Sequence, residues 1–206
     1  MSGSFGRGVR GVRFVWALLL LLCPAPASAL DPSRALTQYR LDRWTPRNGL
    51  PVTSVLCLFQ DRAGYLWIGT QEGLARFDGA AFRMFRVEDH PALAGNYISA
   101  VYEDRRGRIW AGTDGGDLSW FDGEGFVAVP REATLRGQVA GFAESPGGDL
   151  YVAFRGAGLR RLDGSRLVPV PDRGGRPIGR LGALARGADG EIWGGGQGRL
   201  YRFSRG

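Results

Sequence analysis

The stretch Asp61-Arg-Ala-Gly-Tyr-Leu-Trp-Ile-Gly-Thr70, followed by Gly73-Leu-Ala-Arg-Phe-Asp-Gly79, decides the fold because it recurs along the chain. Three further copies cover residues 104–123, which keep most of the pattern, and residues 145–164 and 188–203, which keep its skeleton. Their central aromatic residues fall at positions 67, 110, 151 and 193, which gives spacings of 43, 41 and 42 residues. Such a period indicates an array of similar units that bury their faces only against one another.

Each unit reads as four short β-strands separated by turn residues. In the first unit we predict strands at 54–60, 65–69, 74–77 and 82–85. Four antiparallel strands per repeat of this length are typical of a β-propeller blade. The sequence therefore predicts an all-β protein, a β-propeller with four visible blades.

Two recurrent turns separate the strands. In the Asp-x-x-Gly step and the Phe-Asp-Gly step, the carboxylate can accept backbone N–H bonds and the glycine supplies a positive φ. We predict structural turns at Asp61, Gly64, Asp78, Gly79, Asp104, Gly107, Asp122, Gly123, Asp163 and Gly164.

One large aromatic residue recurs on the second strand of every unit. A flat side chain at this position can bury a large apolar area between neighbouring blades. We interpret Trp67, Trp110, Tyr151 and Trp193 as structural wedges of the core.

The N-terminus differs from the repeats. Arg7, Arg10 and Arg13 precede the apolar run 14–22, and the small-residue pattern Ala27-Ser-Ala29 follows. This order is typical of a secretory signal peptide, with cleavage after Ala29. We therefore divide the chain into a signal peptide, 1–29, and a propeller region, 30–206, that is periplasmic or secreted. The alternative is an uncleaved leader that anchors the protein in the inner membrane, facing the periplasm.

The charge pattern argues against nucleic acid binding. All 27 basic residues are arginines, and three of them lie in the leader, which leaves 24 against 20 acidic residues and lowers the net charge from +7 to +4. The remaining arginines alternate with acidic residues and form no basic helix or aromatic–basic stripe. After cleavage Cys57 is the remaining cysteine, so the predicted mature chain has no intrachain disulfide.

The two ends of the array complement each other. Residues 38–44 resemble the outer strand of a unit, whereas the fourth unit stops at Phe203 after its third strand. An N-terminal strand that completes the last blade would remove the open edges of a propeller. Either the chain closes as a four-bladed ring, or it is the first part of a larger propeller, which we favour. A partial ring would leave an apolar flank through which the protein could self-associate.

No catalytic or metal-binding constellation is evident. His90 lies in a loop beside two carboxylates, without the further ligands that zinc or copper needs. Cys57 belongs to an apolar strand, and the glycine run 194–198 lacks the lysine and the helix of a phosphate-binding loop. We predict no catalytic residues, no metal and no cofactor.

Geometry nevertheless indicates a recognition surface. Since strand directions alternate, the loops between second and third strands and the loops between units share one face of the propeller. Variable polar loops on a rigid scaffold are the usual place for ligand binding. The candidates on this face are Thr70, Gln71, Glu72, His90, Asn96, Tyr97, Thr113, Asp114, Arg155 and Gln197.

The repeat resembles the two-component regulator propeller family. Residues 44–79 follow the pattern of this family nearly position by position. The matching elements are Asn48-Gly-Leu-Pro51, Gly64-Tyr-Leu-Trp-Ile-Gly-Thr70 and Gly73-Leu-Ala-Arg-Phe-Asp-Gly79. The resemblance implies the periplasmic sensor part of a bacterial histidine kinase or diguanylate cyclase. The chain shows no downstream membrane span, phospho-accepting histidine context or nucleotide-binding motif, so such an output activity would belong to a longer parent protein.

The leading hypothesis is thus a non-enzymatic sensor that binds a small extracellular ligand or a periplasmic protein domain. Contact with the membrane would require a retained leader or a C-terminal span outside this sequence. Two alternatives remain. One is a propeller enzyme of the lyase type, for which His90 would be the sole histidine available, and the other is a scaffold that docks a periplasmic protein.

Overall fold

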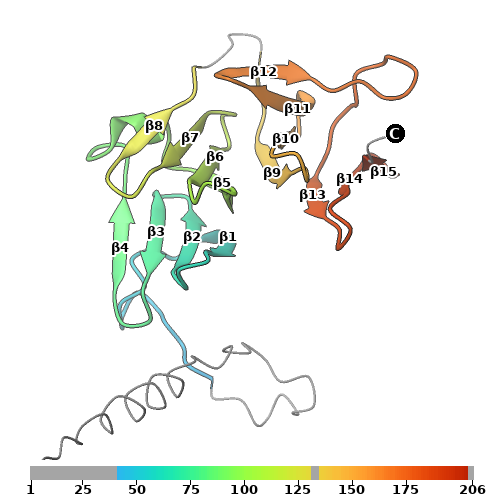
Figure 1. The fold of residues 1–206 in the computed structure, drawn as a ribbon. Helices are drawn as coiled ribbons and strands as arrows, with labels where there is room; N and C mark the ends of the chain where they lie inside the picture. Colours follow the sequence, from blue (N-terminus) through green and yellow to red (C-terminus); the bar gives the residue numbers. More distant parts are fainter. Residues whose placement is uncertain (1–40, 131–134, 204–206) are drawn as a thin grey trace, which may run out of the picture. The chain divides into compact units, whose positions relative to one another are not determined.

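The computed structural model describes residues 41–130 and 135–203, which form fifteen strands and one short 3-10 turn. The strands make four antiparallel sheets that follow one another in sequence order (Figure 1). The first two sheets are β1 (Val55–Gln60), β2 (Leu66–Thr70), β3 (Leu74–Phe77) and β4 (Phe82–Phe85), then β5 (Ile98–Glu103), β6 (Ile109–Thr113), β7 (Leu118–Phe121) and β8 (Phe126–Ala128).

The second pair of sheets repeats this order. The third sheet has β9 (Val139–Glu144), β10 (Leu150–Phe154), β11 (Gly158–Asp163) and β12 (Arg166–Pro169), and the fourth has β13 (Ala183–Arg186), β14 (Ile192–Gly196) and β15 (Arg199–Phe203). The 3-10 turn η3 (Pro91–Leu93) lies between the first and second sheets. One sheet per sequence repeat confirms the predicted β-propeller fold class.

The fourth sheet departs from the expectation of four strands per blade. Over the described residues it contains three, and residues 41–44, the described part of the segment expected to complete it, form no strand. Trp44 instead packs edge-on against Phe77 of the first sheet, with ring centroids 5.1 Å apart. The backbone then enters a turn in which the N–H groups of Asn48 and Leu50 both donate to the carbonyl of Thr45. Aromatic packing on the first sheet and this turn replace strand pairing. Residues 38–40 and the predicted signal peptide lie outside the described residues.

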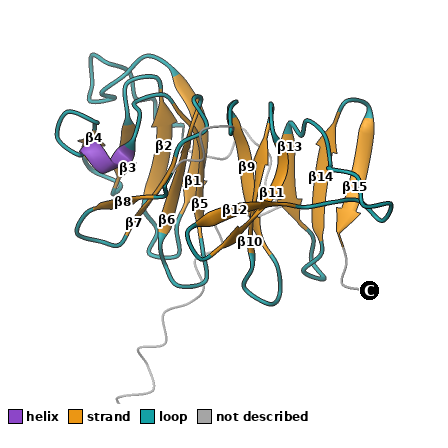
Figure 2. Ribbon diagram, turned by 90° about the horizontal axis from the view of Figure 1, so that it is seen from above, coloured by secondary structure: helices purple, strands orange, loops and turns teal. Residues whose placement is uncertain are grey.

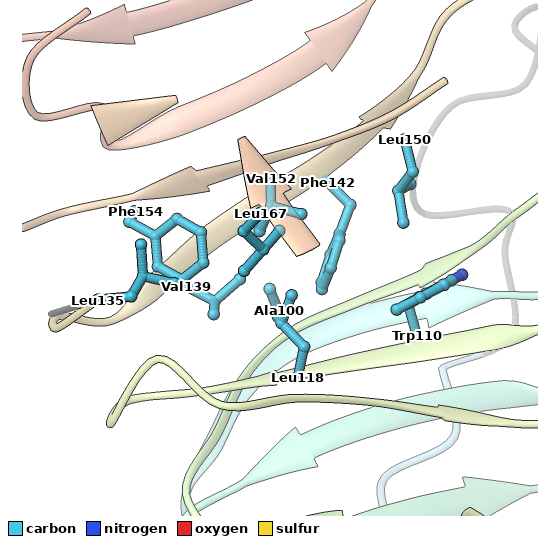
Figure 3. Close-up of a cluster of buried hydrophobic side chains, with 10 residues drawn as sticks. All are labelled: Ala100, Trp110, Leu118, Leu135, Val139, Phe142, Leu150, Val152, Phe154 and Leu167. Carbon is cyan, nitrogen blue, oxygen red and sulfur yellow. The ribbon is translucent and has the colours of Figure 1, made fainter. Parts of the chain in front are cut away.

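Consecutive sheets pack through their first strands: β1 contacts β5, β5 contacts β9, and β9 contacts β13. Apolar side chains from both partners fill each interface, as Figure 3 shows for the second and third sheets, where Trp110 and Phe142 belong to one cluster. Trp67 and Trp110 are each 1% exposed. Tyr151 and Trp193, at the equivalent positions of the third and fourth sheets, are partly buried.

The turn carboxylate and the wedge aromatic of a sheet are linked. Asp61 accepts the indole N–H of Trp67 at 2.7 Å, and Asp104 accepts that of Trp110 at 2.9 Å. The same carboxylates close their hairpins, because Asp61 also accepts the backbone N–H of Tyr65 at 2.9 Å. A buried indole N–H needs an acceptor, and the turn supplies it.

A glycine on the second strand lets the next sheet approach. A Cβ atom at Gly69 would lie 2.6 Å from the carbonyl oxygen of Ile98, and one at Gly112 would lie 2.5 Å from a methyl carbon of Val139. At both glycines, the first residue of the next sheet's inner strand therefore occupies the space that a side chain would need. Within the described residues, no helix is long and apolar enough to cross a membrane.

Candidate functional site

Two kinds of loop meet at one end of the sheets. The N–H of Asp114, just after β6, donates to the carbonyl of Tyr97 in the loop before β5, at 3.0 Å. In the third sheet the N–H of Arg155 donates to the carbonyl of Gln138 at 2.9 Å. Loops between second and third strands thus lie beside loops that join consecutive sheets. In Figure 2 the strands run between two sets of loops, and these contacts belong to one of the two sets.

Both threonines among the candidates are buried inside their own turns. Thr70 Oγ1 donates to the carbonyl of Gly73 at 2.7 Å and accepts the N–H of Glu72 at 3.0 Å. Thr113 Oγ1 accepts the N–H of Asp117 at 2.9 Å. Because these hydroxyls hold the loops, they are not presented to a ligand.

The candidates between the first two sheets also make internal contacts. The Asn96 side chain accepts the N–H of Val87 at 2.8 Å and donates to Glu88 at 3.1 Å, which clamps the loop. The His90 ring lies against Phe85 and Phe126, with centroids 5.4 and 5.6 Å away. His90 is therefore a partly buried member of an aromatic cluster.

The remaining candidates are exposed. Gln71, Glu72, Tyr97, Asp114 and Arg155 have accessible side chains but line neither of the two cavities described below. Gln197, with a positive φ of 52°, does line one, between the loops of the third and fourth sheets. Of the ten candidates, Gln197 is therefore the one that lines either of these two cavities.

This loop cavity has a volume of about 670 Å³. Its walls come from the segment before β9, the β10–β11 loop, the segment before β13 and the β14–β15 loop. Three arginines line it, Arg136, Arg160 and Arg180, and none of its described lining residues is acidic. The volume lies in the usual range of small-molecule sites.

Glycines bring the walls of the loop cavity together. A Cβ atom at Gly137 would lie 2.8 Å from the backbone nitrogen of Gly156. A Cβ atom at Gly158 would lie 1.9 Å from the carbonyl oxygen of Ile178. The loops therefore touch backbone to backbone, which only residues without a side chain permit.

The three arginines are the residues that the sequence-based site prediction missed. A signal was present in the repeat itself. In the strand registers, Arg160 pairs with Val152 as Ala75 pairs with Ile68 and Ser119 with Ala111. An arginine thus stands where the first two units carry a small, fully buried residue.

A second cavity, of about 470 Å³, lies beside the hairpin turns of the third and fourth sheets. Its lining includes Pro146, Tyr151, Glu191 and Arg202. Glu191 accepts the indole N–H of Trp193 at 3.2 Å, which gives this carboxylate a structural role. Mixed charges and this role make it a weaker candidate than the loop cavity.

Neither Cys57 nor a metal cluster adds a reactive site. Burial raises the pKa of Cys57 to about 11, despite a hydrogen bond with the backbone of Gly69 that lowers it. A thiol in this state is protonated at neutral pH and a poor nucleophile. Across the described ranges, no group of three or more His, Cys, Asp or Glu side chains could hold a metal ion.

Comparison with known families identifies the repeat. Residues 49–72 and 92–115 match the family described as two component regulator propeller. These segments contain β1 with β2 and β5 with β6, that is, the inner half of the first two sheets. The resemblance predicted from the sequence is confirmed over these two repeats.

Relatives extend this result. Over 43 residues, or 21% of this chain, the sequence is 46% identical to histidine kinase P4 of Formosa agariphila, and the matched part is 3% of that protein. The extracellular domain of a one component system from B. thetaiotaomicron aligns with a TM-score of 0.64 and 19% identity, over 81% of this chain and 24% of that one.

Virginiamycin B lyase from Staphylococcus aureus aligns less well, with a TM-score of 0.53 and 14% identity, over 72% of this chain and 55% of that one. At these identities the solved structures share the propeller fold, and the fold alone does not carry function. The chain spans less than two thirds of each of these relatives.

Proposed function

We propose that this chain is the ligand-recognition part of an extracytoplasmic sensor in a bacterial signalling protein, and that it is not itself an enzyme. The observation that carries this proposal is the pair of two-component regulator repeats, together with a cavity of about 670 Å³ among the loops of the propeller. The extracellular domain from B. thetaiotaomicron, a signalling protein with the same fold, supports it. A kinase or cyclase activity would reside in a longer parent protein.

The location of the protein can be tested directly. We propose that residues 1–29 are a signal peptide and that the mature protein begins at Leu30. The full chain is expressed in a Gram-negative host, and the periplasmic fraction is analysed by N-terminal sequencing. An intact leader in the membrane fraction would favour the anchored alternative instead.

Ligand recognition by the loop face is tested by a thermal-shift screen of small extracellular metabolites on the full chain. A hit should raise Tm by mass action. Gln197→Ala changes the loop face, and Arg106→Gln changes an exposed hairpin turn at the other end of the sheets. A true loop-face ligand loses its shift in the first variant and keeps it in the second. Equal behaviour of both variants would contradict recognition at this face.

The enzyme alternative rests on the shared fold of the lyase, and it makes a different prediction. If the chain were such a lyase, His90→Ala would abolish turnover. We expect no lyase activity that depends on His90, because its ring packs against the rings of Phe85 and Phe126. Turnover of any lyase substrate that His90→Ala abolishes would contradict the sensor proposal.

A further inference from the structure

We infer that the loop cavity binds the oxyanion of a small ligand, that is, a carboxylate, phosphate or sulfate group held by Arg136, Arg160 and Arg180. This inference rests on the proposed function only in taking the loop face as the recognition surface. It adds the chemical class of the ligand and the residues that select it.

Arg160 is the central observation. It lies on β11, in the register position that holds Ala75 in the first sheet and Ser119 in the second, each 0% exposed. Its Nε atom is buried and has no hydrogen-bond partner. A buried donor of a charged group without an acceptor is costly, so a ligand acceptor for the rest of this guanidinium group would offset part of that cost.

The other two guanidinium groups reinforce the charge. Arg136 and Arg180 are exposed at the rim of the same cavity. Neither forms an ion pair with an acidic residue of the described part of the chain.

Within the described residues, the arginines that do form ion pairs, Arg62, Arg105, Arg108 and Arg161, lie outside this cavity. Arg62 pairs with Glu103 of the next sheet at 2.9 Å, and Arg108 pairs with Asp104 at 2.7 Å. Three arginines therefore line one cavity, and none of the described residues that line it is acidic. Guanidinium groups are suited to planar or tetrahedral oxyanions, which they bind through paired N–H donors.

Backbone contacts between glycine-containing segments hold part of the cavity wall. Gly137 contacts Gly156, and Gly158 contacts the carbonyl of Ile178, so that backbone packing fixes the three loops. Ile178 is 5% exposed and gives the cavity an apolar lining residue. A volume of about 670 Å³ accommodates a sugar-sized molecule that carries the anionic group.

The test compares sugars that carry either an anionic group or a neutral hydroxyl at C6. Glucose 6-phosphate, glucose 6-sulfate and glucuronate are titrated into the full chain by calorimetry, with neutral glucose as the reference and about 0.15 M NaCl to screen nonspecific attraction. We expect at least one anion to bind and glucose to bind at least about tenfold more weakly. The preferred anion distinguishes a carboxylate ligand from a phosphate or sulfate ligand.

Variants then assign the binding to the loop cavity. Arg160→Gln should weaken anion binding by about tenfold or more, because one charge-assisted contact is lost. Arg106→Gln, a matched change at an exposed hairpin turn, should leave the affinity unchanged. If Arg160→Gln fails to fold, Arg136→Gln and Arg180→Gln replace it, since both side chains are exposed.

Two results would overturn the inference. One is the absence of binding by all three anions up to about 50 mM. The other is anion binding that Arg106→Gln weakens as much as the cavity variants do, which would indicate nonspecific attraction. A neutral ligand that depends on Gln197 would overturn the inference while leaving the proposed function intact.

Discussion

At the residue scale, the turn aspartate is the hydrogen-bond acceptor for the wedge tryptophan of the same sheet. The carboxylate of Asp104, on a residue 2% exposed, accepts the indole N–H of Trp110, the Nε–H of Arg108 at 2.7 Å and the backbone N–H of Arg106 at 2.9 Å. The third unit has a serine, Ser145, at the turn position and a tyrosine at the wedge position. In the third unit the carboxylate acceptor and the indole donor are therefore both replaced.

The first prediction concerns Asp104. Asp104→Asn should lower the free energy of unfolding by about 3 kcal/mol, because a buried carboxylate loses its charge and part of its hydrogen bonding. Urea unfolding at pH 7 measures the loss. Asp122→Asn, in an exposed turn of the same sheet, is the control and should cost less. Equal losses would contradict the role of the Trp110 contact.

The pH dependence of stability follows from the same group. Burial raises the pKa of Asp104, but hydrogen bonds from Trp110 and Arg108 outweigh it and hold the pKa below the usual range. A folded-state pKa below the unfolded value means stabilisation that is complete above about pH 4 and lost as pH falls through the folded pKa. Between pH 6 and about pH 3, the wild type should therefore lose more stability than Asp104→Asn. A parallel loss in both proteins would exclude this contribution.

The wedge residues make a second residue-scale prediction. Trp67→Ala should cost about 3–5 kcal/mol of unfolding free energy, because a residue 1% exposed leaves a cavity between two sheets. Trp193→Ala removes the same side chain where it is only partly buried, and should cost less. Chemical unfolding monitored by far-UV circular dichroism compares the two variants. A larger loss for Trp193→Ala would contradict the interface role of Trp67.

At the element scale, glycines decide how closely strands and loops approach. Gly158 opens β11 with φ of 75°, and the carbonyl oxygen of Ile178 occupies the place of its missing side chain. Gly164, in the next hairpin of the same sheet, has φ of 61° and no atom within 4 Å of a Cβ position. Both positions therefore impose backbone strain on any other residue, but only Gly158 also imposes a steric clash.

Gly158→Ala should lower the stability by at least about 2 kcal/mol, since the added methyl collides with a carbonyl and φ remains positive. Gly164→Ala should cost about 1 kcal/mol, because it carries the backbone strain alone. Thermal unfolding of both variants measures the difference. Equal losses would show that the loops can separate without cost, and the loop cavity would not be a fixed site.

At the scale of the whole molecule, the fourth sheet exposes a face that is buried in the earlier sheets. Leu200 pairs with Gly195 as Leu74 pairs with Gly69, yet Leu200 is 72% exposed and Leu74 is 0% exposed. Among the described residues, no atom lies within 4 Å of a Cβ position at Gly195. Apolar side chains of this kind are sites of association.

We therefore expect concentration-dependent self-association of the purified chain, measured by sedimentation velocity. Leu200→Glu should shift the population toward the monomer, because a charge on this face opposes its burial. Val168→Glu, on β12 and 37% exposed, is the control and should have little effect. Association that neither variant changes would argue against this face as the contact.

The sequence by itself determined the propeller class, the four units and their hairpin turns, because these depend on residues a few positions apart. For example, Asp104 and Gly107 belong to one hairpin, where Asp104 accepts a backbone hydrogen bond and Gly107 adopts a positive φ of 79°. The loop face could also be located from alternating strand directions.

Only the tertiary structure decided which side chains form the candidate site. Thr70, Thr113, Asn96 and His90 looked accessible in the sequence, but internal contacts hold them. Arg160 is separated from Arg136 and Arg180 by 24 and 20 positions, and they reach one cavity because glycine contacts draw three loops together. Short-range turn chemistry repeats with the sequence, whereas a cavity depends on the packing of unlike loops from neighbouring sheets.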